Sequence, residues 1–255
     1  MASPSSSGSV SAFELPFPRA LRGELNRHAL LDQITARFEV RTEAVSIDGR
    51  IFPILTVRDT NVLLNAIDPA DFGIDERLPY WAELWPSSIE LARYCLQSRP
   101  YRGMRVLELG CGVGLAGIAA AVSGAVVTMT DFEEDALLFA RWNAAVNLQS
   151  GAMRRNVRIR HMDWRSPGGA GDFDAVIGSD ILYERRSFDP ILDVLVGHLT
   201  ANGCAAFTDP GRRTGVEFGL RAEERGFVVR SERRSLERGG RTQAITTFFL
   251  RRKGS

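Results

Sequence analysis

The stretch that decides the fold is Arg105-Val106-Leu107-Glu108-Leu109-Gly110-Cys111-Gly112-Val113-Gly114-Leu115-Ala116-Gly117. Its apolar run at residues 106–109 predicts a buried strand, and the apolar pattern at residues 115–122 predicts a helix. Glycines alternate through the turn between them. Because glycine has no Cβ, such a strand–turn–helix unit allows the backbone to approach a ligand closely.

A second predicted strand at residues 125–130 leads directly into Asp131, seventeen positions after Gly114. A carboxylate at the end of this strand can accept hydrogen bonds from both hydroxyls of a ribose. The two units together therefore predict a site for a cofactor that contains a nucleoside.

The glycines fit two classes of cofactor. Residues 112–117 satisfy G-x-G-x-x-G with an acid further on, which is the pattern of NAD-binding proteins. The frame Glu108-x-Gly110-x-Gly112-x-Gly114 resembles the first motif of class I S-adenosylmethionine (SAM) methyltransferases, which places an acid inside the strand. NAD requires a helix N-terminus directed at its pyrophosphate, whereas SAM carries no phosphate. The second assignment fits this frame better.

Composition narrows the class of protein. The 255 residues are 44% hydrophobic and 25% charged, and the formal net charge is +1, which suits one large α/β domain with or without an extension. The balanced charge argues against an obligate nucleic-acid partner. No apolar run approaches the length of a membrane span. The three cysteines are far apart and form no metal-binding spacing, so we expect no metal and a reducing, cytoplasmic location.

Strand-like and helix-like segments alternate over most of the chain. The predicted strands are residues 106–109, 125–130, 157–161, 173–178, 204–208, 227–234 and 242–250. The predicted helices are residues 86–97, 115–122, 133–148, 188–199 and 213–225. This alternation predicts an α/β, Rossmann-like fold with a seven-stranded, mostly parallel sheet and helices on both faces. The last strand follows its predecessor too closely for a crossover helix, so it must be antiparallel.

The segments before this sheet form a predicted extension. Residues 1–12 are rich in serine and are expected to be disordered. Residues 13–78 form an extension in which residues 11–37 contribute a helix. Strand-like residues 38–47 and 51–57 flank Asp48-Gly49, which predicts a β-hairpin. The sheet domain then covers residues 79–255, and we expect a monomer although the sequence does not indicate an oligomeric state.

Polar residues follow the predicted parallel strands, where ligands bind in open α/β sheets. They are Gly110, Asp131, Asp163, Ser179 with Asp180, and Asp209. Because the carboxyl ends of parallel strands share one edge of the sheet, these residues should lie around one site.

The chain resembles methyltransferase family 16, a group of protein lysine methyltransferases, over about residues 79–250. The resemblance rests on Pro79-Tyr80-Trp81-x-x-x-Trp85-Pro86, the glycine frame, Asp131, Asp163-Trp164 and Asp180-Ile181-Leu182-Tyr183. Asp209-Pro210-Gly211-Arg212 is similar to the branch that methylates the β subunit of electron transfer flavoprotein. The resemblance implies SAM as cofactor and a protein as substrate.

The resemblance also implies roles for individual residues. The glycines of the frame would cradle the methionine part of SAM, and Glu108 would reach its ammonium group or cap a nearby helix. Asp131 would bind the ribose and also suits a helix start. The remaining predicted cofactor-binding residues are Trp85, Phe132, Asp163, Trp164 and Ser179. Asp180 and Tyr183 are three apart, so they can face one side and place a carboxylate and a phenol beside the transferred methyl group.

We therefore expect N-methylation of a protein lysine. A nucleic-acid methyltransferase is less compatible, because Ser179-Asp180-Ile181-Leu182 stands where enzymes acting on exocyclic amines carry N/D-P-P-Y/F. A small-molecule amine methyltransferase, a non-enzymatic SAM-binding protein and an NAD dehydrogenase remain open.

Overall fold

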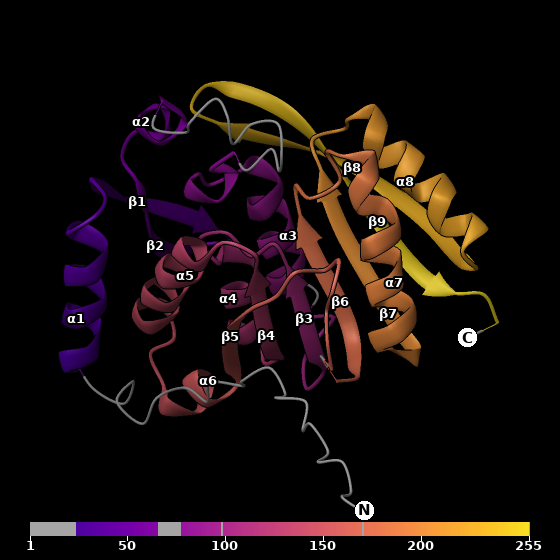
Figure 1. The fold of residues 1–255 in the computed structure, drawn as a ribbon, viewed down its shortest axis with the longest axis horizontal. Coiled ribbons are helices and arrows are strands. Elements are labelled where there is room, and N and C mark those ends of the chain that lie inside the picture. The colour runs from indigo at the N-terminus through magenta and orange to yellow at the C-terminus, as the bar shows by residue number, and fades with distance from the viewer. Residues whose placement is uncertain (1–23, 66–77, 98, 170, 255) are drawn as a thin grey trace, which may run out of the picture.

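The computed structural model describes residues 24–65, 78–97, 99–169 and 171–254. The predicted disorder at residues 1–12 and the first part of the predicted helix at 11–37 lie outside these residues. Figure 1 shows a central sheet with helices packed against it and a separate small hairpin beside it.

The central sheet has seven strands in the order β5-β4-β3-β6-β7-β9-β8. Their bounds are β3 Arg105–Leu109, β4 Val126–Asp131, β5 Val157–His161, β6 Phe173–Ser179, β7 Leu199–Asp209, β8 Phe227–Arg238 and β9 Arg241–Arg252. Neighbours from β5 to β7 pair in parallel, and β9 is antiparallel to both β7 and β8. The predicted mostly parallel sheet with an antiparallel last strand is confirmed.

Helices cover both faces of this sheet. The helices that pack on the sheet are α3 Pro86–Gln97, α4 Leu115–Val122, α5 Glu134–Asn147, α7 Phe188–His198 and α8 Arg213–Glu224. Successive side chains of a strand point to opposite faces. Accordingly, Val106 packs in one hydrophobic cluster with α3, α4 and α5, whereas Leu107 packs in a second cluster with α7 and α8. The short helix α6 (Gly151–Arg155) was not expected from the sequence.

The N-terminal extension packs on the α5 side of the sheet. Helix α1 (Glu24–Thr35) and the hairpin of β1 (Val40–Ile47) and β2 (Arg50–Val57) both contact α5 or its neighbours, and α2 (Thr60–Asn65) follows. Phe52 and Ile54 of the hairpin are fully buried in the same cluster as α5. The predicted helix and hairpin are thus present, and they share one core with the sheet.

The β8–β9 hairpin is longer than its sequence predicts. Its distal half is polar, but Leu236 and Ile245 bury their side chains against the α3 face. At the tip, Arg238 donates to both carboxylate oxygens of Glu43, at 2.6 and 2.7 Å, and to the carbonyl of Leu84 at 2.6 Å. Figure 1 shows this hairpin (yellow) arching over the molecule. It thereby joins the C-terminal strands to the N-terminal extension.

Candidate functional site

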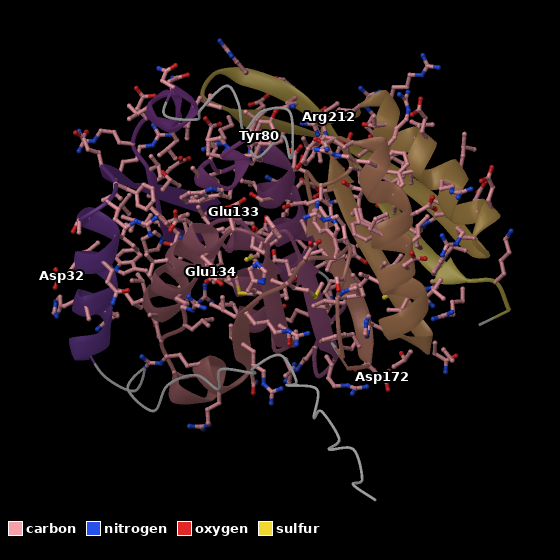
Figure 2. The ribbon with its side chains drawn as sticks, viewed as in Figure 1. Asp32, Tyr80, Glu133, Glu134, Asp172 and Arg212 are labelled. Carbon is pink, nitrogen blue, oxygen red and sulfur yellow. The ribbon has the colours of Figure 1, made fainter. Side chains whose placement is uncertain are left out.

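A cavity of about 550 Å³ opens at the carboxyl edge of the parallel strands. Figure 2 shows Tyr80 and Arg212 at this end of the molecule and Asp172, which precedes β6, at the opposite end. Five strand ends contribute to the lining: the segments that follow β3, β4, β5, β6 and β7. The segment before α3, which includes the 3-10 turn η3 (Tyr80–Ala82), forms a further wall.

The glycine turn after β3 brings backbone to the cavity wall. Gly110 and Gly112 both line the cavity and have positive φ angles of 61° and 52°. A Cβ on Gly112 would lie 3.3 Å from the carbonyl oxygen of Trp81, and one on Gly110 would lie 2.8 Å from Ile181. A side chain at either position would therefore push into the neighbouring wall, which explains the need for glycine.

In contrast to the prediction, Gly114 is not among the residues that line the cavity. Its φ is 92°, and an added Cβ would lie 2.6 Å from Met129 Cε and 3.2 Å from Ala140 Cβ. The glycine at this position allows α5, which carries Ala140, to pack closely on the start of α4. The sequence frame does not separate a ligand-facing glycine from one that serves helix packing.

Glu108 also differs from its predicted place, because it lies behind the glycine turn and does not line the cavity. Its Oε1 accepts a hydrogen bond from the backbone N–H of Gly117 at 3.1 Å, so it caps the start of α4. Its Oε2 is buried and has no hydrogen-bond partner among the residues that the structure describes. Burial raises the pKa of this carboxyl to about 8. Of the two predicted roles, the geometry matches helix capping.

Asp131 lies at the tip of β4 and lines the cavity. One carboxylate oxygen accepts from the backbone N–H of Gly112 at 2.8 Å, and the other from that of Glu133 at 3.0 Å. Burial raises the pKa of Asp131 to about 6, against the opposing effect of these hydrogen bonds. The carboxylate thus ties the glycine turn to the start of α5 while it borders the cavity.

The side chains predicted to contact an adenine line the next part of the wall. Phe132 packs against His161 with ring centroids 5.4 Å apart, and Trp164 lies near Gly110. Asp163 accepts from the backbone N–H of Arg165 at 2.9 Å, and its two oxygens accept from Arg165 Nε at 2.9 and 3.0 Å. Burial acts to raise the pKa of Asp163, but the hydrogen bonds from Arg165 outweigh it and lower this pKa.

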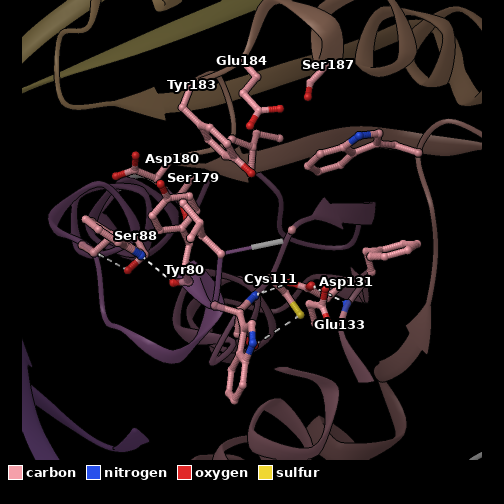
Figure 3. A pocket seen from close by; sticks show the side chains of 18 of the residues that line it. Tyr80, Ser88, Cys111, Asp131, Glu133, Ser179, Asp180, Tyr183, Glu184 and Ser187 are labelled. Atoms are coloured by element: carbon pink, nitrogen blue, oxygen red, sulfur yellow. Dashed lines mark hydrogen bonds between the residues drawn. The ribbon is translucent and has the colours of Figure 1, made fainter. Parts of the chain in front are cut away.

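Asp180 and Tyr183 lie together on the opposite wall, as Figure 3 shows with Ser179 beside them and Asp131 across the cavity. Tyr183 packs edge-to-face on Tyr80 at 5.5 Å between ring centroids. Tyr80 in turn contacts the ring of Trp85, whose Nε1 donates to the Tyr80 carbonyl at 2.7 Å. Burial, followed by the neighbouring Glu184, raises the pKa of Tyr183 to about 12, so its phenol is neutral at physiological pH.

Sequence reasoning assigned no role to Arg212, which lines the cavity and forms an ion pair with Asp180. The signal that points to it is its position three residues after Asp209, at the end of a parallel strand. Of the predicted site residues, Trp85, Gly110, Gly112, Asp131, Phe132, Asp163, Trp164, Ser179, Asp180 and Tyr183 meet around the cavity.

Within the described residues, no cluster of histidine, cysteine, aspartate and glutamate has the grouping of a metal site. The helices described are also too short or too polar to cross a membrane.

Known proteins similar to this chain were found by sequence. Mouse protein N-lysine methyltransferase METTL21A is 34% identical over 48% of this chain and 56% of its own length. The Xenopus laevis electron transfer flavoprotein beta subunit lysine methyltransferase is 30% identical over 52% and 53%. A Dictyostelium discoideum histidine protein methyltransferase 1 homolog is 30% identical over 56% and 47%. The chain thus spans about half the length of the curated relatives it matches.

Solved structures agree in fold. The T. thermophilus 16S rRNA methyltransferase RsmC, solved with AdoMet and guanosine, has a TM-score of 0.55 at 16% identity, over 84% of this chain and 51% of its own. The putative RNA methyltransferase PH1948 from Pyrococcus horikoshii has a TM-score of 0.52 at 16% identity, over 75% and 93%. These likenesses show a methyltransferase-like Rossmann fold.

The model of methyltransferase family 16, described as lysine methyltransferase, matches residues 80–217, which include the glycine turn, Asp131 and Asp180. This match covers more than half of the chain, and the chain belongs to this lysine methyltransferase family.

Proposed function

We propose that this chain is a SAM-dependent N-methyltransferase that methylates a lysine side chain of a protein. The observation that carries the proposal is that the carboxylate of Asp131 and the side chains of Asp180 and Tyr183 lie on facing walls of one cavity. The names of the METTL21A and electron transfer flavoprotein relatives support a protein lysine as acceptor.

The residues present fit SAM better than a dinucleotide. Gly110 and Gly112 bring backbone to the cavity wall at positions where a Cβ would crowd Ile181 and Trp81, and the aromatic rings of Phe132 and Trp164 border the same cavity. At the start of α4, the N–H of Gly117 already binds the carboxylate of Glu108. A pyrophosphate requires a free helix N-terminus, so this buried acid disfavours NAD at that helix.

Each wall would have a separate task. Asp131 would bind the ribose hydroxyls, and Phe132 and Trp164 would flank the adenine. When bound, SAM supplies an electrophilic methyl group on a sulfonium. Asp180 and the neutral phenol of Tyr183 would orient the acceptor nitrogen, and the rings of Tyr80 and Trp85 would exclude water from it.

The acceptor must arrive as a free amine, because an ammonium has no lone pair. A free lysine has a pKa near 10.4. Burial among aromatic rings and the positive sulfonium both disfavour the charged form of the amine.

The cytoplasmic location expected from the separated cysteines stays a prediction.

A labelling experiment tests the proposal. The purified protein is incubated with SAM carrying a tritiated methyl group and an extract of source cells that lack the gene, and the products are run on a denaturing gel. We expect label in a protein band that yields methyl-lysine on hydrolysis. Self-labelling is a small background, because Lys253 is the only lysine of the chain.

The other acceptor classes give different results. Methyl-histidine in the band would favour the activity named for the Dictyostelium relative. Label only in nucleic acid or in small molecules would contradict the proposal, and so would absence of SAM binding by calorimetry.

A further inference from the structure

Arg212 is held in place by Asp209, the last residue of β7. The Asp209 side chain is fully buried. Its Oδ1 accepts from the backbone N–H of Arg212 at 2.6 Å, and its Oδ2 accepts from Arg212 Nη1 at 3.1 Å. Gly215 lies directly behind it, since an added Cβ would be 3.2 Å from Asp209 Oδ1. Because Arg212 is held both at its backbone N–H and at its guanidinium, its side chain has little freedom to move.

The same Nη1 of Arg212 donates to Oδ1 of Asp180. Asp180 is itself fixed from its backbone, because its N–H donates to the Thr208 carbonyl at 2.8 Å and its φ is 60°. A positive φ is unusual for a residue other than glycine, although aspartate tolerates it better than most. The tertiary structure thus places this carboxylate directly against a guanidinium on the cavity wall.

This pairing matters for the charge of the acceptor. A lone carboxylate close to an amine favours the ammonium form, and an adjacent cation opposes it. Asp180 alone would therefore bind the lysine in the state that cannot accept a methyl group. Because Arg212 pairs with both Asp180 and Asp209, it leaves the three side chains with one formal negative charge in place of two. Asp180 can still accept a hydrogen bond from a neutral amine.

Other charged groups around the cavity have partners of their own or lie on other walls. On the segment after β6, Glu184 pairs with Arg186, next to the phenol of Tyr183. On the far wall, Asp163 pairs with Arg165. The remaining titratable groups that border the cavity are Cys111 in the glycine turn, Asp131 at the end of β4, Glu133 after it, and Tyr80 and Glu83 before α3, where Glu83 accepts from Thr60.

We propose that Arg212 is a positioning residue that acts through Asp180: by offsetting the negative charge of this carboxylate, it favours the free-amine form of the acceptor lysine. The inference rests on the proposed function. It adds a role for the arginine after β7, whose Nη1 donates to the carboxylates of Asp180 and Asp209.

The test compares Arg212→Gln, Arg212→Lys and a matched control, Arg213→Gln. Arg213 is the next residue, loses the same charge on substitution and has an 89% exposed side chain paired with Glu217. Each variant is loaded with tritiated-methyl SAM and mixed with the purified acceptor protein, which is identified from the labelled band of the extract. The rate of a single turnover is then measured from about pH 6.5 to 10, and SAM affinity is measured by calorimetry.

We expect the rising limb of the wild-type profile to move upward by about one pH unit in Arg212→Gln, a loss of about tenfold at neutral pH that narrows towards pH 10. Arg212→Lys should keep the wild-type limb, Arg213→Gln should match the wild type, and SAM affinity should change less than threefold in all three. This pattern would support the role.

Three other patterns would overturn it. They are an equal loss at every pH in Arg212→Gln, a wild-type profile in that variant, and a collapse of SAM affinity that accounts for its lost rate. If the wild type labels no acceptor at all, the proposed function itself fails and this inference fails with it. If the wild type labels the acceptor but the rising limb of Arg212→Gln does not move, the inference fails and the proposed function stands.

Discussion

Asn143 and Leu55 exchange two hydrogen bonds, although they lie on different elements far apart in the sequence. The backbone N–H of Leu55 donates to Asn143 Oδ1 at 2.7 Å, and Asn143 Nδ2 donates to the Leu55 carbonyl at 3.1 Å. The same Nδ2 donates to the carbonyl of Val113 in the glycine turn at 2.9 Å. One buried amide on α5 therefore joins the N-terminal hairpin to the cavity wall.

This joint predicts that the extension affects both stability and cofactor binding. Asn143→Leu leaves three buried backbone groups without partners and should lower the free energy of unfolding by about 3 kcal/mol. It should also weaken SAM binding, because Val113 loses its anchor. Asn147→Leu is the matched control, since Asn147 donates to Pro53 of the hairpin at 2.9 Å but not to the glycine turn. It should lower stability alone. Urea unfolding and calorimetry separate the two effects, and equal SAM affinities would contradict the link.

Two helical glycines should respond in opposite ways to alanine. A Cβ on Gly117 would lie 2.2 Å from Glu108 Oε2 and 2.7 Å from Met129 Cγ, so Gly117→Ala should destabilise the protein by about 2 kcal/mol or more. Gly197 lies in α7, and apart from its own helix backbone no described atom lies within 4 Å of an added Cβ, so Gly197→Ala should stabilise by about 0.5–1 kcal/mol. Thermal unfolding of the pair provides the measurement. A stable Gly117→Ala protein would show that Glu108 can move away.

The buried acid Glu108 predicts a stability that falls with pH. Its pKa is about 8 in the folded chain and near 4.5 when unfolded, so the folded state binds more protons between these values. Raising the pH through this window ionises the unfolded state first and reduces the free energy of unfolding. Glu108→Gln removes this titration. From about pH 5.5 to 8, it should gain on the order of 2 kcal/mol relative to the wild type. Urea unfolding without SAM at several pH values tests this, and parallel curves would argue against it.

Asp131 predicts the pH dependence of SAM binding. With its pKa raised to about 6, the carboxyl gains a proton as the pH falls below that value and loses an acceptor for the ribose. Wild-type affinity should therefore decline below about pH 6. Asp131→Asn should bind at least about tenfold more weakly, roughly 1.4 kcal/mol, with little pH dependence. Asp172→Asn, at the opposite end of the sheet, is the control for a lost acid. Calorimetry that finds equal affinity for Asp131→Asn would remove Asp131 from the ribose site.

Asp180 offers a separation between binding and transfer. Asp180→Asn tolerates the positive φ of this position, whereas Asp180→Ala adds roughly 1 kcal/mol of backbone strain. Both variants should lose methyl transfer while SAM affinity stays within about tenfold, because Asp180 faces the proposed acceptor and not the ribose side. Single-turnover labelling and calorimetry measure the two quantities. Full transfer by Asp180→Asn would exclude a role for the carboxylate.

The elements of the sheet were predictable to within a few residues, because local patterns define them. The run at Val106–Leu109 and the alternation of strand and helix require only neighbours in sequence. The meeting of Asp131 with Asp180 was also predictable, since the carboxyl ends of parallel strands share one edge. The β8–β9 hairpin was underestimated because its polar tip is stabilised by distant partners, Glu43 and Leu84.

The sequence by itself determined a Rossmann-like sheet, the edge of that sheet where a ligand binds and the set of polar residues found there. Only the tertiary structure decided that Gly114 and Glu108 serve the packing of α4, that Arg212 pairs with Asp180, and that Asn143 joins the extension to the glycine turn. The physical reason is the sequence separation over which each kind of interaction acts. Periodicity and turn chemistry act between near neighbours, whereas burial, ion pairing and close packing depend on groups that the folded chain brings together from distant positions.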